Sequence, residues 1–250
     1  MFTHFIKKLT RRFWILFLFS ASGCNAMNKF PPENYFHGAQ LTLAQAIANG
    51  NISEIEVLAP NTALNKPGVE DMTLLFYAVQ AAKDRNERQI AAIRQLVKNG
   101  ADPLQDVPDM GSVAEVLATS PYPIYMQALL DGGMSANAKI MGRPVFYRAA
   151  SDNTLSTLKL MVERGGDINQ GDSLGRSVLM YALDGMQLDT VEWLLNHGAN
   201  PNAVETNTGW SFMRQLDDVI TRNGGDTGAT HKKLMEIIQL AKQKGGRPYL

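Results

Sequence analysis

Few residues in this chain have the types and spacing that catalysis requires. The histidines lie far apart in the sequence, and none has a carboxylate or a cysteine at a spacing known from acid–base or metal sites. The glycine-rich stretch 224–228 lacks the lysine of a phosphate-binding loop, and the chain has no dinucleotide-binding motif. The sequence therefore predicts a protein that is not an enzyme and holds no metal or cofactor. The four histidines are His4, His37, His197 and His231.

Cys24 is the residue with the most distinctive chemistry, and it is the only cysteine in the chain. Residues 1–12 carry four Lys or Arg residues and no acid, residues 13–19 are apolar, and small residues follow. This order is typical of a secretory signal. Because a membrane-spanning helix needs about 20 apolar residues, we expect residues 1–23 to be a cleaved signal peptide. A single cysteine also excludes an intramolecular disulfide.

Residues 21–24, Ala-Ser-Gly-Cys, resemble the lipobox of bacterial lipoproteins. By that resemblance Cys24 becomes lipidated, and Asn25 after it favours the outer membrane of a Gram-negative bacterium. The resemblance implies a periplasmic protein that meets the membrane through its lipid anchor only. An ordinary secreted protein cleaved near Gly23 is the alternative. The Arg11-Arg12 pair also leaves twin-arginine export open beside the general secretory route.

The charge of the chain changes once the signal is removed. Residues 24–40 contain two consecutive prolines and little periodicity, so we expect them to form a tether from the lipidated cysteine. The remaining chain has 20 basic and 24 acidic residues, a net charge of −4. The part from Arg214 onward is basic, at +3, so residues 24–213 carry about −7. An acidic body argues against nucleic acid as a partner and suits a cationic protein.

A short motif occurs four times, each time as an apolar pair, two polar or small residues and a glycine. Its glycines stand at positions 100, 133, 165 and 198, which are 33, 32 and 33 residues apart. A fixed period near 33 indicates stacked helical repeats, because each repeat buries its apolar face on the next. The sequence predicts two short antiparallel helices in each repeat.

These units resemble ankyrin repeats. Residues 175–182, Gly-Arg-Ser-Val-Leu-Met-Tyr-Ala, match the opening motif, and residues 191–202 match the closing one. Residues 142–169 and 71–102 match as well, and residues 110–137 match more weakly. The resemblance implies an all-α solenoid of stacked helix-turn-helix units with short hairpin fingers. It covers about six units within residues 41–246, the terminal ones degenerate.

The repeats depart from the family pattern at one position. A histidine in the opening motif normally links neighbouring loops by hydrogen bonds, and this chain lacks it. Whether the loops are held as firmly as in consensus repeats is therefore left open. The position is occupied by Phe76, Glu115, Tyr147 and Met180.

The resemblance also implies where a partner binds. In ankyrin repeats the hairpin fingertips and the exposed side of the first helices form the binding face. Two tyrosines and an arginine at such positions are typical of interface hot spots, although the tyrosine rings could instead pack between helices. The expected contact residues are Tyr77, Arg148 and Tyr181 on the first helices and Asp106, Asp109, Lys139, Ile140, Asp172, Leu174 and Glu205 on the fingertips.

Four segments resemble a narrower group, the bacterial ankyrin lipoproteins that act as immunity proteins against type VI secretion effectors, notably lipases. This resemblance implies a secreted antibacterial effector as the partner. A binder tethered in the periplasm is well placed to neutralise an enzyme that attacks membrane lipids there. The alternative is an envelope scaffold that stabilises a housekeeping periplasmic enzyme. The segments are 43–50, 70–76, 129–134 and 188–192.

Overall fold

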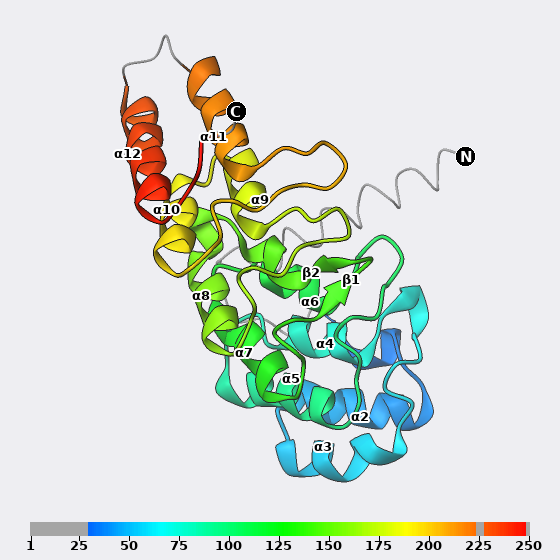
Figure 1. The fold of residues 1–250 in the computed structure, drawn as a ribbon. Helices are drawn as coiled ribbons and strands as arrows, with labels where there is room; N and C mark the ends of the chain where they lie inside the picture. The colour runs from blue at the N-terminus through cyan, green and yellow to red at the C-terminus, as the bar shows by residue number, and fades with distance from the viewer. Residues whose placement is uncertain (1–29, 224–227, 249–250) are drawn as a thin grey trace, which may run out of the picture. The chain divides into compact units, whose positions relative to one another are not determined.

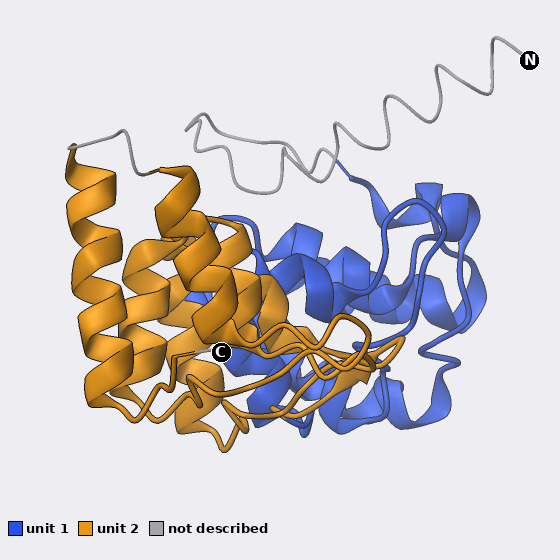
Figure 2. Cartoon of the chain, turned by 45° about the horizontal axis from the view of Figure 1, so that its top comes forward, with its two compact units in different colours: residues 1–135 blue, residues 136–250 orange. Residues whose placement is uncertain are grey.

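The computed structural model describes residues 30–223 and 228–248. They form two compact units, with the division between Ser135 and Ala136 (Figures 1 and 2). Cys24, the predicted signal peptide and the start of the predicted tether lie outside the described residues. Within the described ranges, no helix has the length and apolar character needed to cross a bilayer.

Unit 1 is built from pairs of helices joined by short turns. Most of its α-helices begin at a residue whose side chain accepts a hydrogen bond from a free backbone N–H group; Thr73, for example, accepts from Phe76 N at 3.2 Å. The apolar side of each helix is buried against its neighbours. The elements are η1 (Pro32–Asn34), α2 (Gly38–Asn49), α3 (Ile52–Leu58), η2 (Ala59–Asn61), η3 (Val69–Asp71), α4 (Leu74–Ala81), α5 (Glu87–Lys98), α6 (Val113–Ala118) and α7 (Pro123–Asp131).

Unit 2 follows the same plan and adds a two-stranded hairpin. In that hairpin Lys139 pairs with Pro144 and Ile140 with Arg143. The first helix of its first repeat is a short 3-10 helix, η4, where the sequence predicts an ordinary helix. The elements are β1 (Lys139–Ile140), β2 (Arg143–Pro144), η4 (Val145–Ala149), η5 (Asp152–Thr154), α8 (Leu155–Glu163), α9 (Val178–Asp184), α10 (Leu188–Asn196), α11 (Phe212–Arg222) and α12 (Ala229–Gln243).

The periodic glycines end the second helix of each repeat. Gly100, Gly165 and Gly198 have φ angles of 97°, 91° and 91°, and Gly133 has 112°. Side chains other than glycine rarely adopt this left-handed region. The period read from the sequence therefore marks the points where the chain leaves a helix and turns toward the next hairpin.

Asparagine side chains link each repeat to the next within a unit. In unit 2, Asn169 Nδ2 donates to the carbonyl of Gly198 at 3.1 Å, and its Oδ1 accepts from Asn200 N at 2.8 Å. Asn65 and Asn137 make the same pair of bonds to the glycine and the second residue after it in the following repeat. These bonds hold the helix ends in register from repeat to repeat.

We expect Asn169→Ala to lower the free energy of unfolding by about 1 kcal/mol, because two hydrogen bonds are lost at an exposed site. Urea denaturation of the purified protein measures this change. Asn196→Ala, at the exposed end of α10, is the matched control and should be near neutral. An equal loss in both variants would contradict a linking role for Asn169.

Residues 30–40 are part of unit 1, which corrects the expectation that the tether extends to residue 40. Tyr35 and Phe36 are 8% and 1% exposed. The carbonyl of Tyr35 accepts a hydrogen bond from Val69 N at 2.8 Å, and α2 already begins at Gly38. The sequence pattern missed this because two buried aromatic residues are enough to fix a short segment that has no helical period.

Because Tyr125 is buried in unit 1, we expect the free energy of unfolding to fall at alkaline pH. Burial raises the pKa of Tyr125 to about 12, whereas an unfolded tyrosine titrates near pH 10. The neutral form is favoured in the folded state, so this contribution is complete below pH 10. It is lost as pH rises toward 12, at about 1.4 kcal/mol per pH unit.

We therefore expect Tyr125→Phe to be less stable than the parent at pH 7, because the hydrogen bond of 2.9 Å from the Tyr125 hydroxyl to Ala82 O is lost. Above pH 10, however, its stability should fall less steeply. Urea midpoints measured from pH 8 to pH 11 test this difference in slope. Identical slopes would show that Tyr125 ionises equally in both states.

Candidate functional site

Unit 2 presents three hairpin fingers, which we define as finger A (139–144), finger B (170–176) and finger C (203–212). Finger A turns through Met141 and Gly142, with φ angles of 50° and 79°. In finger B, Asp172 and Arg176 are joined by a backbone hydrogen bond of 3.0 Å, and in finger C Glu205 N donates to Trp210 O at 2.9 Å. Each finger is therefore a closed loop with its own backbone hydrogen bonds.

Neighbouring fingers are bonded to one another. The ammonium of Lys139 in finger A donates to the carbonyl of Gly171 in finger B at 3.1 Å. The carbonyl of Leu174 in finger B accepts from both the backbone N and the hydroxyl of Thr206 in finger C, each at 2.8 Å. The three fingers thus form one connected surface.

Tyr147 is hydrogen-bonded to both ends of finger B. It stands at the position of the missing family histidine, and it is 1% exposed. Its hydroxyl lies 2.8 Å from the carbonyl oxygen of Gln170 and 2.6 Å from that of Arg176, the two ends of finger B. Burial raises the pKa of Tyr147, so the hydroxyl remains a neutral donor. A tyrosine therefore takes over the loop-linking role in this repeat.

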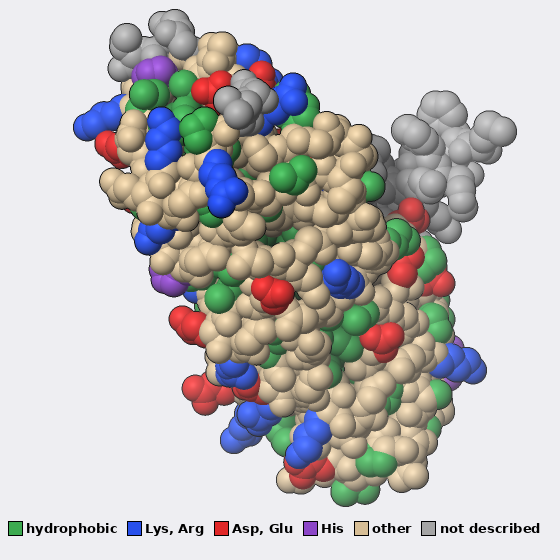
Figure 3. Space-filling view, viewed as in Figure 1, with side chains coloured by type: hydrophobic (Ala, Val, Ile, Leu, Met, Phe, Trp, Pro, Cys, Tyr) green, Lys and Arg blue, Asp and Glu red, His purple; other side chains and the backbone are tan. Residues whose placement is uncertain are grey.

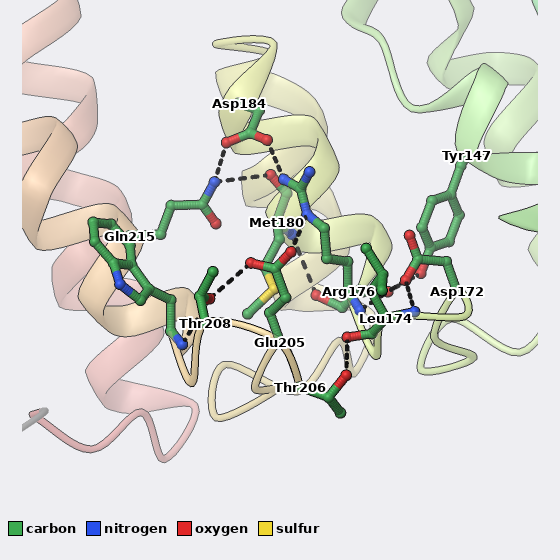
Figure 4. A network of polar contacts seen from close by, with 12 residues as sticks. Tyr147, Asp172, Leu174, Arg176, Met180, Asp184, Glu205, Thr206, Thr208 and Gln215 are labelled. Atoms are coloured by element: carbon green, nitrogen blue, oxygen red, sulfur yellow. Dashed lines mark hydrogen bonds and ion pairs between the residues drawn. The ribbon is translucent and has the colours of Figure 1, made fainter.

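Arg176 is the centre of a polar network that connects finger B, finger C and α9 (Figure 4). Its guanidinium is ion-paired with Asp184, and its Nε lies 4.0 Å from a carboxylate oxygen of Glu205. Gln215 from α11 also donates to Asp184. Burial lowers the pKa of Arg176, but the hydrogen bond to Asp184 and the negative charges of Asp184, Glu205 and Asp172 together outweigh it, so the pKa is raised. The guanidinium stays charged, and its contacts with Glu205 and Asp184 link finger B to finger C and to α9.

Each finger carries one exposed apolar side chain, at the tip of fingers A and B and at the base of finger C, where Val204 bridges to Ser211. Met141 in finger A is 91% exposed, Leu174 in finger B is 43% exposed and Val204 in finger C is 48% exposed. The three residues occupy successive fingers that are bonded to each other. Large apolar side chains that a fold leaves in water at neighbouring positions mark an interaction surface.

Seven of the ten predicted contact residues lie in unit 2, five of them on the fingers and the other two, Arg148 and Tyr181, on η4 and α9. Lys139, Arg148 and Leu174 are exposed, and Ile140, Asp172, Tyr181 and Glu205 are partly buried. The other predicted fingertip residues belong to unit 1. There Asp106 and Asp109 are exposed, Asp109 within a tight loop closed by a bridge between Val107 and Gly111 and Asp106 directly before it.

The expectation for Tyr77 is wrong. Tyr77 is 2% exposed, and its ring centroid lies 5.5 Å from that of Phe36 and 6.3 Å from that of Tyr35. Its hydroxyl donates to Phe30 O at 3.0 Å. Residues 30–36 cover the side of α4 that the family pattern leaves open, so this tyrosine is a packing residue and has no free ring for a partner.

Sequence reasoning missed two arginines, in and beside the fingers of unit 2, that stand over aromatic rings. The guanidinium of Arg143 lies 5.9 Å from the ring centroid of Tyr181, and that of Arg214 lies 4.5 Å from the ring centroid of Trp210. Such cation–π pairs are common at interfaces. A signal was available for Arg143, which lies three residues after the predicted fingertip residue Ile140.

The site has the composition of a binding surface. In the described part of the chain, no group of three or more His, Cys, Asp and Glu residues is placed to hold a metal. The face seen in Figure 3 carries charges of both signs among hydrophobic side chains, and basic side chains gather over α11 and α12. The arrangement suits contact with another macromolecule through apolar tips and fixed charges.

Known proteins with related sequences and structures agree with this architecture. A family model for three copies of the ankyrin repeat matches residues 121–205. The B-cell lymphoma 3 protein homolog of Mus musculus is 32% identical over 151 residues, which cover 54% of this chain and 33% of the mouse protein. The chain therefore spans about a third of that relative's length.

Two solved structures have the same fold. The crystal structure of the ankyrin repeat domain of Bcl-3, described as a unique member of the IkappaB protein family, has a TM-score of 0.59 at 23% identity. It covers 82% of this chain and 86% of that chain. An ankyrin repeat domain from Acinetobacter baumannii has a TM-score of 0.58 at 21% identity, covering 82% and 98%. This chain therefore has the ankyrin-repeat fold, a fold that typically mediates protein–protein interaction and is typically not enzymatic.

Proposed function

We propose that fingers A, B and C of unit 2, with the adjoining side of its first helices, bind a protein partner. The observation that carries this proposal is the set of exposed apolar side chains, Met141, Leu174 and Val204, on three successive fingers that are hydrogen-bonded to each other. Folding leaves these side chains in water, whereas binding would bury them. A surface that is already ordered also loses little entropy when a partner docks.

We further propose that the partner is a secreted antibacterial effector, of the lipase type, that the chain neutralises as a lipid-anchored periplasmic immunity protein. The support is the sequence resemblance together with the signal and Cys24, which lie outside the described residues. Neutralisation needs tight binding. Nanomolar affinity corresponds to about −12 kcal/mol, which a standard interface of roughly 1,600 Å² can supply.

The experiment is affinity capture from native envelope extract with the tagged full chain, followed by an activity assay of the co-purified protein. The finger variant Met141→Asn/Leu174→Ser removes two exposed tips. The matched control Val57→Ser/Met235→Ser removes two exposed apolar side chains from α3 and α12, outside the fingers of unit 2. We expect the control to retain the partner in stoichiometric amount and the finger variant to lose it.

The activity of the captured protein separates the two functions. Loss of a lipase or other toxin activity in the complex would support the immunity function. A resident periplasmic enzyme that stays active in the complex would support the envelope scaffold instead. Equal capture by the finger variant and the control would contradict the proposed surface itself.

A further inference from the structure

The acidic excess of the mature chain belongs to unit 1 alone. Residues 25–135 contain 7 basic and 12 acidic residues, whereas residues 136–250 contain 13 basic and 12 acidic residues. Unit 2 is therefore near neutral, at +1. The whole-chain charge, which suggests a cationic partner, therefore does not indicate what the fingers of unit 2 bind.

Carboxylates on the finger surface are already engaged within the unit. One oxygen of Asp172 accepts hydrogen bonds from the backbone N of Leu174 at 2.9 Å and of Arg176 at 3.0 Å. Glu205 accepts from Thr208 at 3.0 Å and lies near Arg176, which is also paired with Asp184. These acids serve the fingers themselves and offer little negative charge to a partner.

By contrast, the basic groups in finger A are available to pair with carboxylates of a partner. Lys139 and Arg143 are exposed and, in the part of the chain that the structure describes, neither forms an ion pair with a carboxylate. Lys139 donates to the carbonyl of Gly171, and Arg143 stands over the ring of Tyr181. A guanidinium over a ring keeps its N–H groups at the edge free for a carboxylate.

Met141 lies between these two cations, at a position where methionine is costly. The first residue of this two-residue turn has φ of 50°, a conformation for which asparagine or glycine is preferred. The side chain is 91% exposed, so packing does not offset the cost. An unfavourable residue that the fold does not use points to a role in binding.

From this juxtaposition we infer that finger A receives an acidic segment of the partner protein that carries an apolar side chain. The carboxylates of that segment pair with Lys139 and Arg143, and its apolar side chain meets Met141 and the neighbouring tip Leu174. This inference rests on the proposed function and specifies the chemistry of its partner. Apolar tips beside only a few cations favour a protein over a nucleic acid, which requires a wider basic surface.

The test places a photo-crosslinking amino acid at position 141 of the full chain in cells that encode it, with position 235 as the control site. Both are exposed methionines of unit 2, and Met235 lies on α12. Mass spectrometry then identifies the linked segment. Charge reversal by Lys139→Glu/Arg143→Glu is compared with Lys232→Glu/Lys242→Glu, which makes the same charge change on α12.

We expect an adduct at position 141 whose linked segment has a net negative charge and an apolar residue. The adduct yield should fall about tenfold with Lys139→Glu/Arg143→Glu, which corresponds to about 1.4 kcal/mol, and stay unchanged with the α12 pair. A neutral or basic linked segment, or a yield that ignores charge reversal, would overturn the inference and leave the finger surface intact. A nucleic-acid adduct, or no adduct above the position 235 background, would overturn the inference and the proposed function together.

Discussion

Gly68→Ala is expected to lower the free energy of unfolding by about 3 kcal/mol. A Cβ atom at this position would lie 2.2 Å from the carbonyl oxygen of Tyr35 and 2.9 Å from the ring of Phe36. That carbonyl cannot move aside easily, because it accepts a hydrogen bond of 2.8 Å from Val69 N. The substitution therefore disrupts the packing of residues 30–36 against the rest of unit 1. Urea denaturation measures the loss.

Gly38→Ala is the control for this experiment. Gly38 has a left-handed φ of 55°, but a Cβ there would meet no atom within 4 Å. Only backbone strain is added, and we expect a cost of about 1 kcal/mol. If Gly68→Ala costs no more than Gly38→Ala, the N-terminal segment is not packed on unit 1 as the structure has it.

Tyr147→Phe is expected to lower the free energy of unfolding by about 2 kcal/mol and to weaken partner binding. The substitution removes the buried hydroxyl between the carbonyls of Gln170 and Arg176 and leaves them without their donor. Finger B then loses its link to η4. Thermal denaturation measures the stability, and capture of the partner at a temperature well below the transition measures binding of the folded variant.

Tyr181→Phe is the matched control, since the ring of Tyr181 lies 5.8 Å from that of Tyr147. Its hydroxyl has no hydrogen-bond partner among the described residues. The control should change stability by less than about 0.5 kcal/mol. A loss in Tyr181→Phe as large as that in Tyr147→Phe would mean that packing of the rings, and not the hydroxyl of Tyr147, holds finger B.

The features that repeat along the chain were predictable from the sequence. The 33-residue period is visible because the backbone requires glycine at the end of each second helix. Glycine alone readily adopts the left-handed φ angle found at residues such as Gly165 and Gly198. The serine and threonine caps and the apolar stripes recur for similar local reasons. The end of the signal peptide, the lipid anchor and the periplasmic location stay predictions.

The features that differ between repeats were harder to predict. Tyr77 and Tyr181 occupy equivalent positions, yet Tyr77 is buried, because residues 30–36 pack over it, whereas Tyr181 is only partly buried. The linking role of Tyr147 was hidden because the family pattern points to a histidine. Met141 was passed over because sequence patterns assign apolar residues to the core, whereas here the turn geometry places it in water.

The most direct test of the account is amide hydrogen exchange of the full chain, measured alone and with the partner that co-purifies with it. Binding to the fingers predicts new protection in residues 139–144, 170–176 and 203–212, with little change in α8, α10 and α12. Protection confined to those helices, with the three fingers exchanging as in the free protein, would contradict the proposal that the fingers of unit 2 are the binding surface.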